Sequence, residues 1–170
     1  DDAYWGLYTM CGGCGTQAKV FRTLANTSGL TVRSTLNAED HNWDEVLIDN
    51  QWVIFDYGMR NVSKDFYEKP QAAGGWDKQF SHIVAVYSNG TEVDVTQDYT
   101  TVSNLTVRAT LNSKPLSGLE VIILSNNRKS YVEDSHQYAN RVFTRLVGMT
   151  DEKGETTFTL GDGNYTCLLY

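Results

Sequence analysis

The segment TMCGGCGTQAKVF, residues 9–21, contains two of the three cysteines of the chain, Cys11 and Cys14. Apolar residues recur at helical spacing through residues 15–27, and Gly29 stands where a glycine commonly ends a helix. Cys14 is therefore expected at the N-terminus of a helix, where unpaired N–H groups and the helix dipole stabilise a thiolate. The thiolate is the form in which a cysteine acts as a nucleophile.

A histidine and an aspartate on a predicted β-hairpin are the second candidate group. Asp49 and Asn50 are residue types that accept the left-handed conformations of a tight turn, and two β-rich runs flank them. A two-residue turn at this point makes His41 and Asp56 diagonal neighbours across the hairpin, with Cβ atoms about 7–8 Å apart or less. A carboxylate that orients an imidazole holds its tautomer and keeps it basic. Together with Cys14, the pair forms a candidate catalytic triad.

The same residues admit other interpretations. A buried structural cysteine beside a surface histidine and aspartate would carry no chemistry. A thiol-disulfide oxidoreductase also places a Cys-x-x-Cys motif between a strand and a helix, but this chain lacks the preceding β–α unit and a proline placed opposite the dithiol. A zinc site needs four ligands, and Cys11, Cys14 and His41 stop one short, so no metal and no cofactor are expected.

Several other residues are assigned no chemistry. Asp44 and Glu45 are expected to face solvent, Trp43 and Trp52 to pair across the hairpin as core or platform residues, and His82 and His136 to take core or surface positions without acidic partners.

The pattern of predicted elements changes near residues 98–103. Before that point a strand is expected at residues 30–36, a hairpin around Asn89-Gly90 and an irregular excursion at residues 59–80. After it, short alternating strands are separated by turn residues, a pattern typical of a small β-sandwich. The expected strands of this part lie within residues 104–112, 119–125, 141–150, 154–161 and 164–170, and the expected turns include Lys114-Pro115 and Glu152-Lys153-Gly154. We therefore predict two domains, residues 1–98 and residues 99–170.

Composition limits the class of protein. The chain has 170 residues, a hydrophobic content of 41% and a net charge of −7, which favours packed domains and disfavours nucleic acid as a partner. It contains no apolar run long enough to span a membrane. The opening residues and the strand that runs into Tyr170 favour a segment cut from a longer chain. An excess of Asn-x-Ser/Thr sequons favours an extracellular or cell-surface protein; they are at Asn26, Asn61, Asn89, Asn104 and Asn164.

Three blocks of sequence, GGCGTQAKVFRTLANTSGLTVR, HNWDEV and QWVIFD, resemble in order and spacing the core of the transglutaminase-like superfamily. That superfamily includes transglutaminases, peptide:N-glycanases and microbial cysteine proteases or amidases. The resemblance implies an α+β papain-like fold in which a helix carries the cysteine and an antiparallel sheet carries the histidine and the aspartate. It implies Cys14 as nucleophile, His41 as general base and acid, and Asp56 as the residue that orients His41. The segment after residue 99 looks like a transthyretin-like or carboxypeptidase-regulatory-like sandwich.

The resemblance covers residues 5–98 and leaves two departures. About ten residues precede the cysteine where the family has a helical segment, and Cys11 is additional to the motif. The backbone N–H of Cys14 is one oxyanion donor by position, with Trp5 or Tyr8 as conceivable others. The expected activity is acyl transfer or amide hydrolysis through a thioester on a peptide, protein or glycopeptide. A non-catalytic cell-surface binding or scaffold module is the alternative, and no oligomeric state is predicted.

Overall fold

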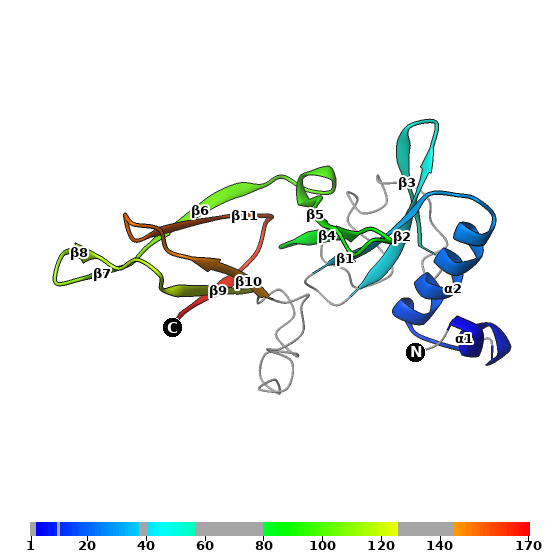
Figure 1. Ribbon diagram of the computed structural model, residues 1–170, viewed down its shortest axis with the longest axis horizontal. Helices are drawn as coiled ribbons and strands as arrows, with labels where there is room; N and C mark the ends of the chain where they lie inside the picture. The colour runs from blue at the N-terminus through cyan, green and yellow to red at the C-terminus, as the bar shows by residue number, and fades with distance from the viewer. Residues whose placement is uncertain (1–2, 10, 38–40, 57–79, 126–144) are drawn as a thin grey trace.

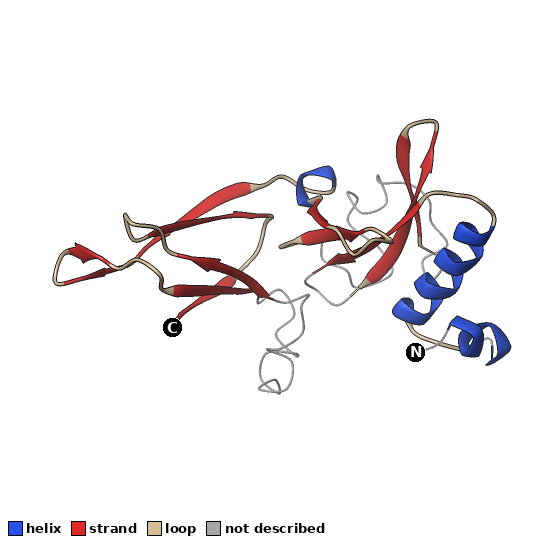
Figure 2. Ribbon diagram, viewed as in Figure 1, coloured by secondary structure: helices blue, strands red, loops and turns tan. Residues whose placement is uncertain are grey.

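The computed structural model describes five stretches of the chain, namely residues 3–9, 11–37, 41–56, 80–125 and 145–170. The expected irregular segment, apart from its last residue, and His136 lie outside the described residues. The described part is of the α+β class, with two α-helices and several antiparallel sheets (Figure 2). The helices and the first sheet lie at one end of the molecule and β6 to β12 at the other (Figure 1).

Two helices open the described chain, α1 (Ala3–Thr9) and α2 (Cys14–Thr27), and they pack against each other. Gly6 allows the close approach, because a Cβ at this position would lie 2.7 Å from the Thr16 side chain. The sequence did not indicate α1. The end of α2 is as predicted, since Gly29 adopts a φ of 80° and the N–H of Leu30 reaches back to the carbonyl of Ala25.

A five-stranded sheet follows the helices, in the order β3-β2-β1-β4-β5 with every pair antiparallel. Its strands are β1 (Val32–Asn37), β2 (Asn42–Ile48), β3 (Gln51–Phe55), β4 (Ile83–Val86) and β5 (Glu92–Asp94). A short 3₁₀ helix, η1 (Thr96–Asp98), closes this part. The predicted hairpin around Asn89-Gly90 is confirmed as the connection between β4 and β5.

The hairpin formed by β2 and β3 has the predicted two-residue turn. Asp49 and Asn50 both have positive φ angles, 48° and 62°, as a type I′ turn requires. Ile48 pairs with Gln51, and the register continues without a bulge to Asp44 opposite Phe55. The expected pairing of the two tryptophans is wrong, since Leu47 lies opposite Trp52.

The two faces of this sheet are covered by different groups of side chains. Helix α2 covers one face, where Ala25, Val32 and Val46 are buried and Phe21 and Phe55 pack beside them. The other face holds a larger cluster, which consists of Trp43, Ile54, Phe80, Ile83, Ala85, Val95 and Tyr99. Strands β2 and β3 contribute to both clusters because successive side chains of a strand point to opposite faces.

The second part of the chain is built from short strands, as predicted. They form one sheet with the order β10-β9-β12, a pair of β11 and β6, and a small hairpin of β7 and β8. The strands are β6 (Ser103–Arg108), β7 (Thr110–Leu111), β8 (Lys114–Pro115), β9 (Glu120–Ser125), β10 (Arg145–Met149), β11 (Glu155–Leu160) and β12 (Tyr165–Leu169). A shared cluster of Val121, Ile123, Phe158 and Leu160 packs between β9 and β11.

One turn in this part differs from the expectation. Lys114 and Pro115 form strand β8, and the chain reverses instead at Asn112 and Ser113, whose φ angles are 50° and 64°. Proline lacks a backbone N–H, which is tolerated here because β8 belongs to an isolated two-stranded hairpin. The predicted turn at Glu152-Lys153-Gly154 is confirmed by a φ of 75° at Gly154.

Candidate active site

Cys14 is the first residue of α2, as predicted, and its side chain is half-buried. The residue before it, Gly13, has no side chain with which to cap the helix. No side chain therefore caps the first turn of α2, and the positive end of the helix dipole favours the thiolate form of Cys14. The backbone N–H groups of Asn42 and Gly15 act on the thiol in the same direction and also lower the pKa of Cys14.

His41 and Asp56 form a close pair at the edge of the sheet. His41 directly precedes β2 and Asp56 directly follows β3, so the hairpin register brings them together. Nε2 of His41 lies 2.6 Å from Oδ2 of Asp56, and the two side chains are only 10% and 3% exposed. The carboxylate can therefore hold the imidazole in one orientation and stabilise its charged form.

His41 lies close enough to the Cys14 thiol for each side chain to act on the other's ionisation. The influence of His41 lowers the pKa of Cys14, and it outweighs burial, which acts in the opposite direction. Burial alone would lower the pKa of His41, but hydrogen bonds to Asp56 and then to Cys14 raise it to about 9. The lowered pKa of Cys14 and the raised pKa of His41 both favour a thiolate–imidazolium pair near neutral pH. The three residues singled out in the sequence thus lie in one connected group.

A small pocket lies beside the group, between α2 and the hairpin. Its lining includes Cys14 and Asp56 together with Gln17 and Asn42. Trp43 also lines it, and its ring lies 5.6 Å from the His41 ring, measured between centroids. The pocket therefore brings both polar and aromatic side chains next to the thiol.

The expectation that Asp44 and Glu45 face solvent is wrong, since both side chains are fully buried. Arg22 of α2 donates to Asp44 with an Nη1–Oδ1 distance of 2.9 Å. Glu45 accepts from Arg33 at 2.6 Å and from the hydroxyl of Tyr99 at 2.7 Å. The alternating pattern of the strand did not reveal these charges as buried, because their partners come from distant segments.

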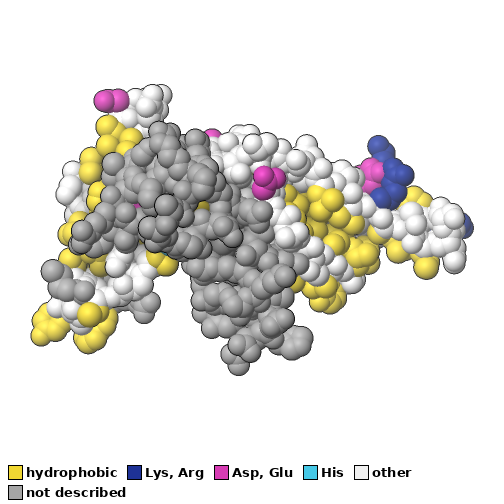
Figure 3. All heavy atoms as spheres, turned by 180° about the vertical axis from the view of Figure 1, so that it is seen from behind, with side chains coloured by type: hydrophobic (Ala, Val, Ile, Leu, Met, Phe, Trp, Pro, Cys, Tyr) yellow, Lys and Arg dark blue, Asp and Glu magenta, His cyan; other side chains and the backbone are white. Residues whose placement is uncertain are grey.

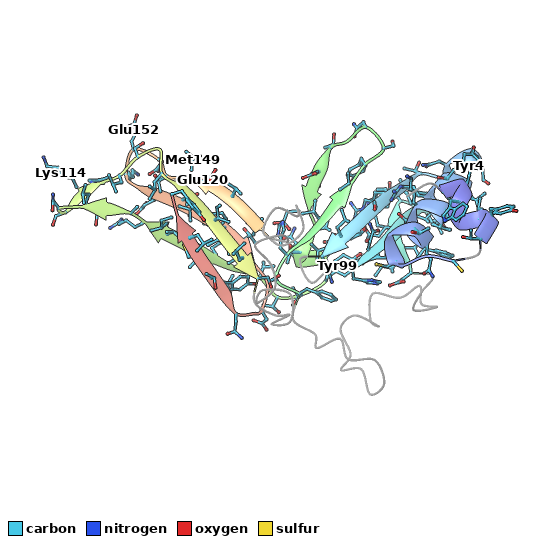
Figure 4. The ribbon with its side chains drawn as sticks, turned by 90° about the horizontal axis from the view of Figure 1, so that it is seen from below. Tyr4, Tyr99, Lys114, Glu120, Met149 and Glu152 are labelled. Carbon is cyan, nitrogen blue, oxygen red and sulfur yellow. The ribbon has the colours of Figure 1, made fainter. Side chains whose placement is uncertain are left out.

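Glu45 is connected to the aromatic side of the site. The hydroxyl of Tyr99 that bonds to Glu45 also accepts from Nε1 of Trp43 at 3.0 Å. Trp43 itself packs against His41. Tyr99 comes from the segment that follows η1, and Figure 4 shows it near the middle of the molecule, with Tyr4 at one end and Lys114 at the other. The sequence contains no signal for this connection.

Other candidate residues take no part in the group. Cys11 is exposed. Trp5 and Tyr8, on α1, are 64% and 85% exposed. Figure 3 shows hydrophobic side chains at the surface both at the α1 end and over the β6 to β12 part. The expectation that His82 lacks an acidic partner is wrong, because its Nδ1 lies 3.8 Å from Oδ2 of Asp94.

The described residues offer neither a metal site nor a membrane-spanning helix. No group of three or more His, Cys, Asp or Glu side chains within them is placed to hold a metal ion. None of their helices has the length and apolar character needed to cross a membrane.

Comparison with known proteins gives one informative similarity. The chain matches no known family model. It is 30% identical over 96 residues to a peptide-N(4)-(N-acetyl-beta-glucosaminyl)asparagine amidase of Caenorhabditis briggsae. The matched region is 55% of this chain and 15% of that protein, so the chain spans a small fraction of the length of its relative.

Proposed function

We propose that this chain is a cysteine-dependent amidase or acyltransferase of the transglutaminase-like type, acting through Cys14, His41 and Asp56. The observation that carries the proposal is the connected group itself. The pKa of the thiol at the head of α2 is lowered chiefly by the neighbouring His41, and Nε2 of His41 lies 2.6 Å from Oδ2 of Asp56. Similarity to a protein named as an amidase supports the same class of reaction.

The proposed reaction begins with attack of the Cys14 thiolate on an amide carbonyl carbon. A C–S bond forms, the imidazolium of His41 gives its proton to the amide nitrogen, and the C–N bond breaks to release an amine. Asp56 keeps the imidazole oriented and stabilises its positive charge throughout. The product of this half of the reaction is a thioester on Cys14.

Water or an amine then resolves the thioester. His41, now neutral, takes a proton from the attacking molecule as it adds to the thioester carbonyl. The C–S bond breaks, and Cys14 leaves as a thiolate that is again paired with imidazolium. Water gives a carboxylic acid and completes a hydrolysis, whereas an amine gives a new amide. The proposed substrate is a peptide, protein or glycopeptide amide, with the glycopeptide favoured by the name of the relative.

The proposal includes an architecture and a location. Residues 1–98 would be the catalytic core, and residues 99–170 an appended transthyretin-like sandwich. An extracellular or cell-surface location is supported by the exposure of four sequon asparagines, which are Asn26, Asn89, Asn104 and Asn164. Glycosylation at these positions, measured by peptide mapping of the protein from its own source, would test the location.

Alkylation of Cys14 by iodoacetamide tests the chemistry. The rate is measured by mass spectrometry from about pH 5 to about pH 10, with the exposed Cys167 as a reference thiol in the same sample. We expect Cys14 to react faster than Cys167 near neutral pH, and His41→Ala to abolish the difference. Equal rates for the two thiols, unchanged by His41→Ala, would contradict the proposal.

A second measurement separates an enzyme from a binding module. The protein is incubated with an N-glycopeptide and with the matching unglycosylated peptide, and the digest is searched for a thioester on Cys14 and for hydrolysed product. Cys14→Ser serves as the inactive control. A reactive Cys14 that forms neither thioester nor product with any peptide amide would favour the non-catalytic alternative.

A further inference from the structure

Asn37, the last residue of β1, is bonded to both main-chain polar groups of His41. Its side-chain Oδ1 accepts a hydrogen bond from the N–H of His41 at 2.7 Å. Its backbone N–H donates to the carbonyl of His41 at 3.1 Å. The Asn37 side chain is 1% exposed, so this double contact is shielded from water.

The contact with Asn37 fixes the main chain from which the His41 side chain projects. The assigned β1–β2 pairing ends with Leu36 opposite Asn42, and the bond from the Asn37 N–H to the His41 carbonyl continues it by one residue. The His41 ring that follows from this placement lies 2.6 Å from Asp56 and acts on the Cys14 thiol. Asn37 holds the main chain of His41 through hydrogen bonds, and Asp56 and Trp43 contact its ring.

The side-chain amide of Asn37 uses only one of its two polar atoms. Within the described part of the chain its Nδ2 has no hydrogen-bond partner although it is buried. An unmatched buried donor is destabilising, so an apolar residue would suit the burial better. What the amide contributes is the Oδ1 acceptor for His41.

From these contacts we propose that Asn37 is a positioning residue, which holds His41 in the orientation that activates Cys14. The inference rests on the proposed function, because it gives Asn37 a role in the reactivity of the Cys14 thiol. A purely structural role would stabilise the end of β1 and leave that reactivity unchanged. The two roles are therefore separable by measuring the pH dependence of alkylation and the stability of the same variants.

Four proteins are compared by their Cys14 alkylation profiles and thermal unfolding: wild type, Asn37→Ala, Asn37→Asp and Thr96→Val. Asn37→Asp keeps an acceptor oxygen for the N–H of His41 but replaces the neutral amide with an ionisable carboxyl. Thr96→Val is the matched control, since Thr96 is also fully buried in this part of the fold and bonds to the main chain of Ile83. Asn37→Ser replaces Asn37→Ala if the latter does not fold, because its oxygen is too close to the backbone to reach His41 unaided.

We expect Asn37→Ala or Asn37→Ser to move the midpoint of the Cys14 profile upward and to slow alkylation near neutral pH by about tenfold, the equivalent of about one pKa unit. Asn37→Asp, which keeps the acceptor oxygen, should move the midpoint less than Asn37→Ala does, with any shift due to its added charge. Thr96→Val should lose stability without moving the midpoint. A wild-type midpoint in Asn37→Ala, a shift in Asn37→Asp as large as in Asn37→Ala, or an equal shift in Thr96→Val would overturn the inference. A wild-type Cys14 that behaves as an ordinary thiol would instead overturn the proposed function itself.

Discussion

The ring of Phe21 stacks on the ring of Phe55, with centroids 3.8 Å apart and planes inclined by 10°. Phe21 lies two turns along α2 from Cys14, and Phe55 is the residue before Asp56. The stack therefore joins the element that carries the thiol to the strand that carries the carboxylate. Arg22, next in the helix, adds an ion pair with Asp44 on the neighbouring strand.

Phe21→Ala should loosen this connection. Removing a stacked, half-buried aromatic ring leaves a cavity, and we expect a loss of about 2–4 kcal/mol in the free energy of unfolding. Because α2 would be less firmly held against the hairpin, alkylation of Cys14 near neutral pH should also slow. Urea unfolding and the alkylation rate measure the two effects.

A matched control for this variant is Tyr8→Ala. Tyr8 is 85% exposed on α1, and its removal should change stability by less than about 0.5 kcal/mol. Equal losses in Phe21→Ala and Tyr8→Ala would show that the stack does not connect the two elements.

Asp44 predicts an unusual pH dependence of stability. Burial, assisted by the nearby charge of Asp56, raises the pKa of Asp44 to about 7, although Arg22 acts in the opposite direction. A carboxyl whose pKa is raised on folding binds more protons in the folded state, so its contribution to stability is present at low pH and is lost as the pH rises through about 7.

Asp44→Asn removes this titration. We expect the difference in unfolding free energy between Asp44→Asn and wild type to change in favour of the variant between about pH 4 and about pH 8, on the order of a few kcal/mol. Urea unfolding at several pH values measures it. A difference that is constant over this range would mean that Asp44 is an ordinary ionised partner of Arg22.

The contrast between Cys14 and Asp44 shows what the sequence could reveal. The position of Cys14 followed from local signals, namely the periodic run behind it and the glycines before it. The meeting of His41 with Asp56 followed from one turn, because Asp49 and Asn50 set the register of the whole hairpin.

The buried charges required information from distant parts of the chain. Asp44 and Glu45 are consecutive in β2, so nothing local showed either of them as buried, and only tertiary packing brings Arg22 and Arg33 to their carboxylates. The contact of Asn37 with His41 is likewise tertiary, since Asn37 could not be told from any other strand-end asparagine. Helix α1 was missed because it is short and owes its place to packing against α2.

Asp56→Asn should lower the pKa of His41 from its value of about 9. The substitution keeps the size of the side chain but removes the charge that favours imidazolium. Histidine resonances followed by NMR against pH measure the change. His82 is the reference in the same spectrum, since burial lowers its pKa and Asp56 is not among the groups that act on it.

The same variant has a consequence for stability. A histidine whose pKa is raised on folding stabilises the protein below its unfolded pKa of about 6.5, and this contribution is lost as the pH rises through about 9. Asp56→Asn should therefore be less stable than wild type at neutral pH and should approach it at higher pH. A His41 resonance that titrates identically in both proteins would exclude Asp56 as its partner.

Gly161 is expected to be intolerant of any side chain, because it lies where the two parts of the chain meet. Its N–H donates to the carbonyl of Ser81 at 2.9 Å, and a Cβ on it would lie 1.9 Å from the carbonyl oxygen of Phe80. Phe80 belongs to the same buried cluster as Trp43. Gly161→Ala should therefore force the backbone to move and destabilise the protein by about 2–4 kcal/mol.

Gly15→Ala in α2 is the control with the opposite sign. A Cβ at Gly15 meets nothing within 4 Å, so this substitution should stabilise the helix by about 0.5–1 kcal/mol. Thermal unfolding of both variants decides the matter, and a Gly161→Ala protein as stable as wild type would contradict the close packing of Gly161 on Phe80.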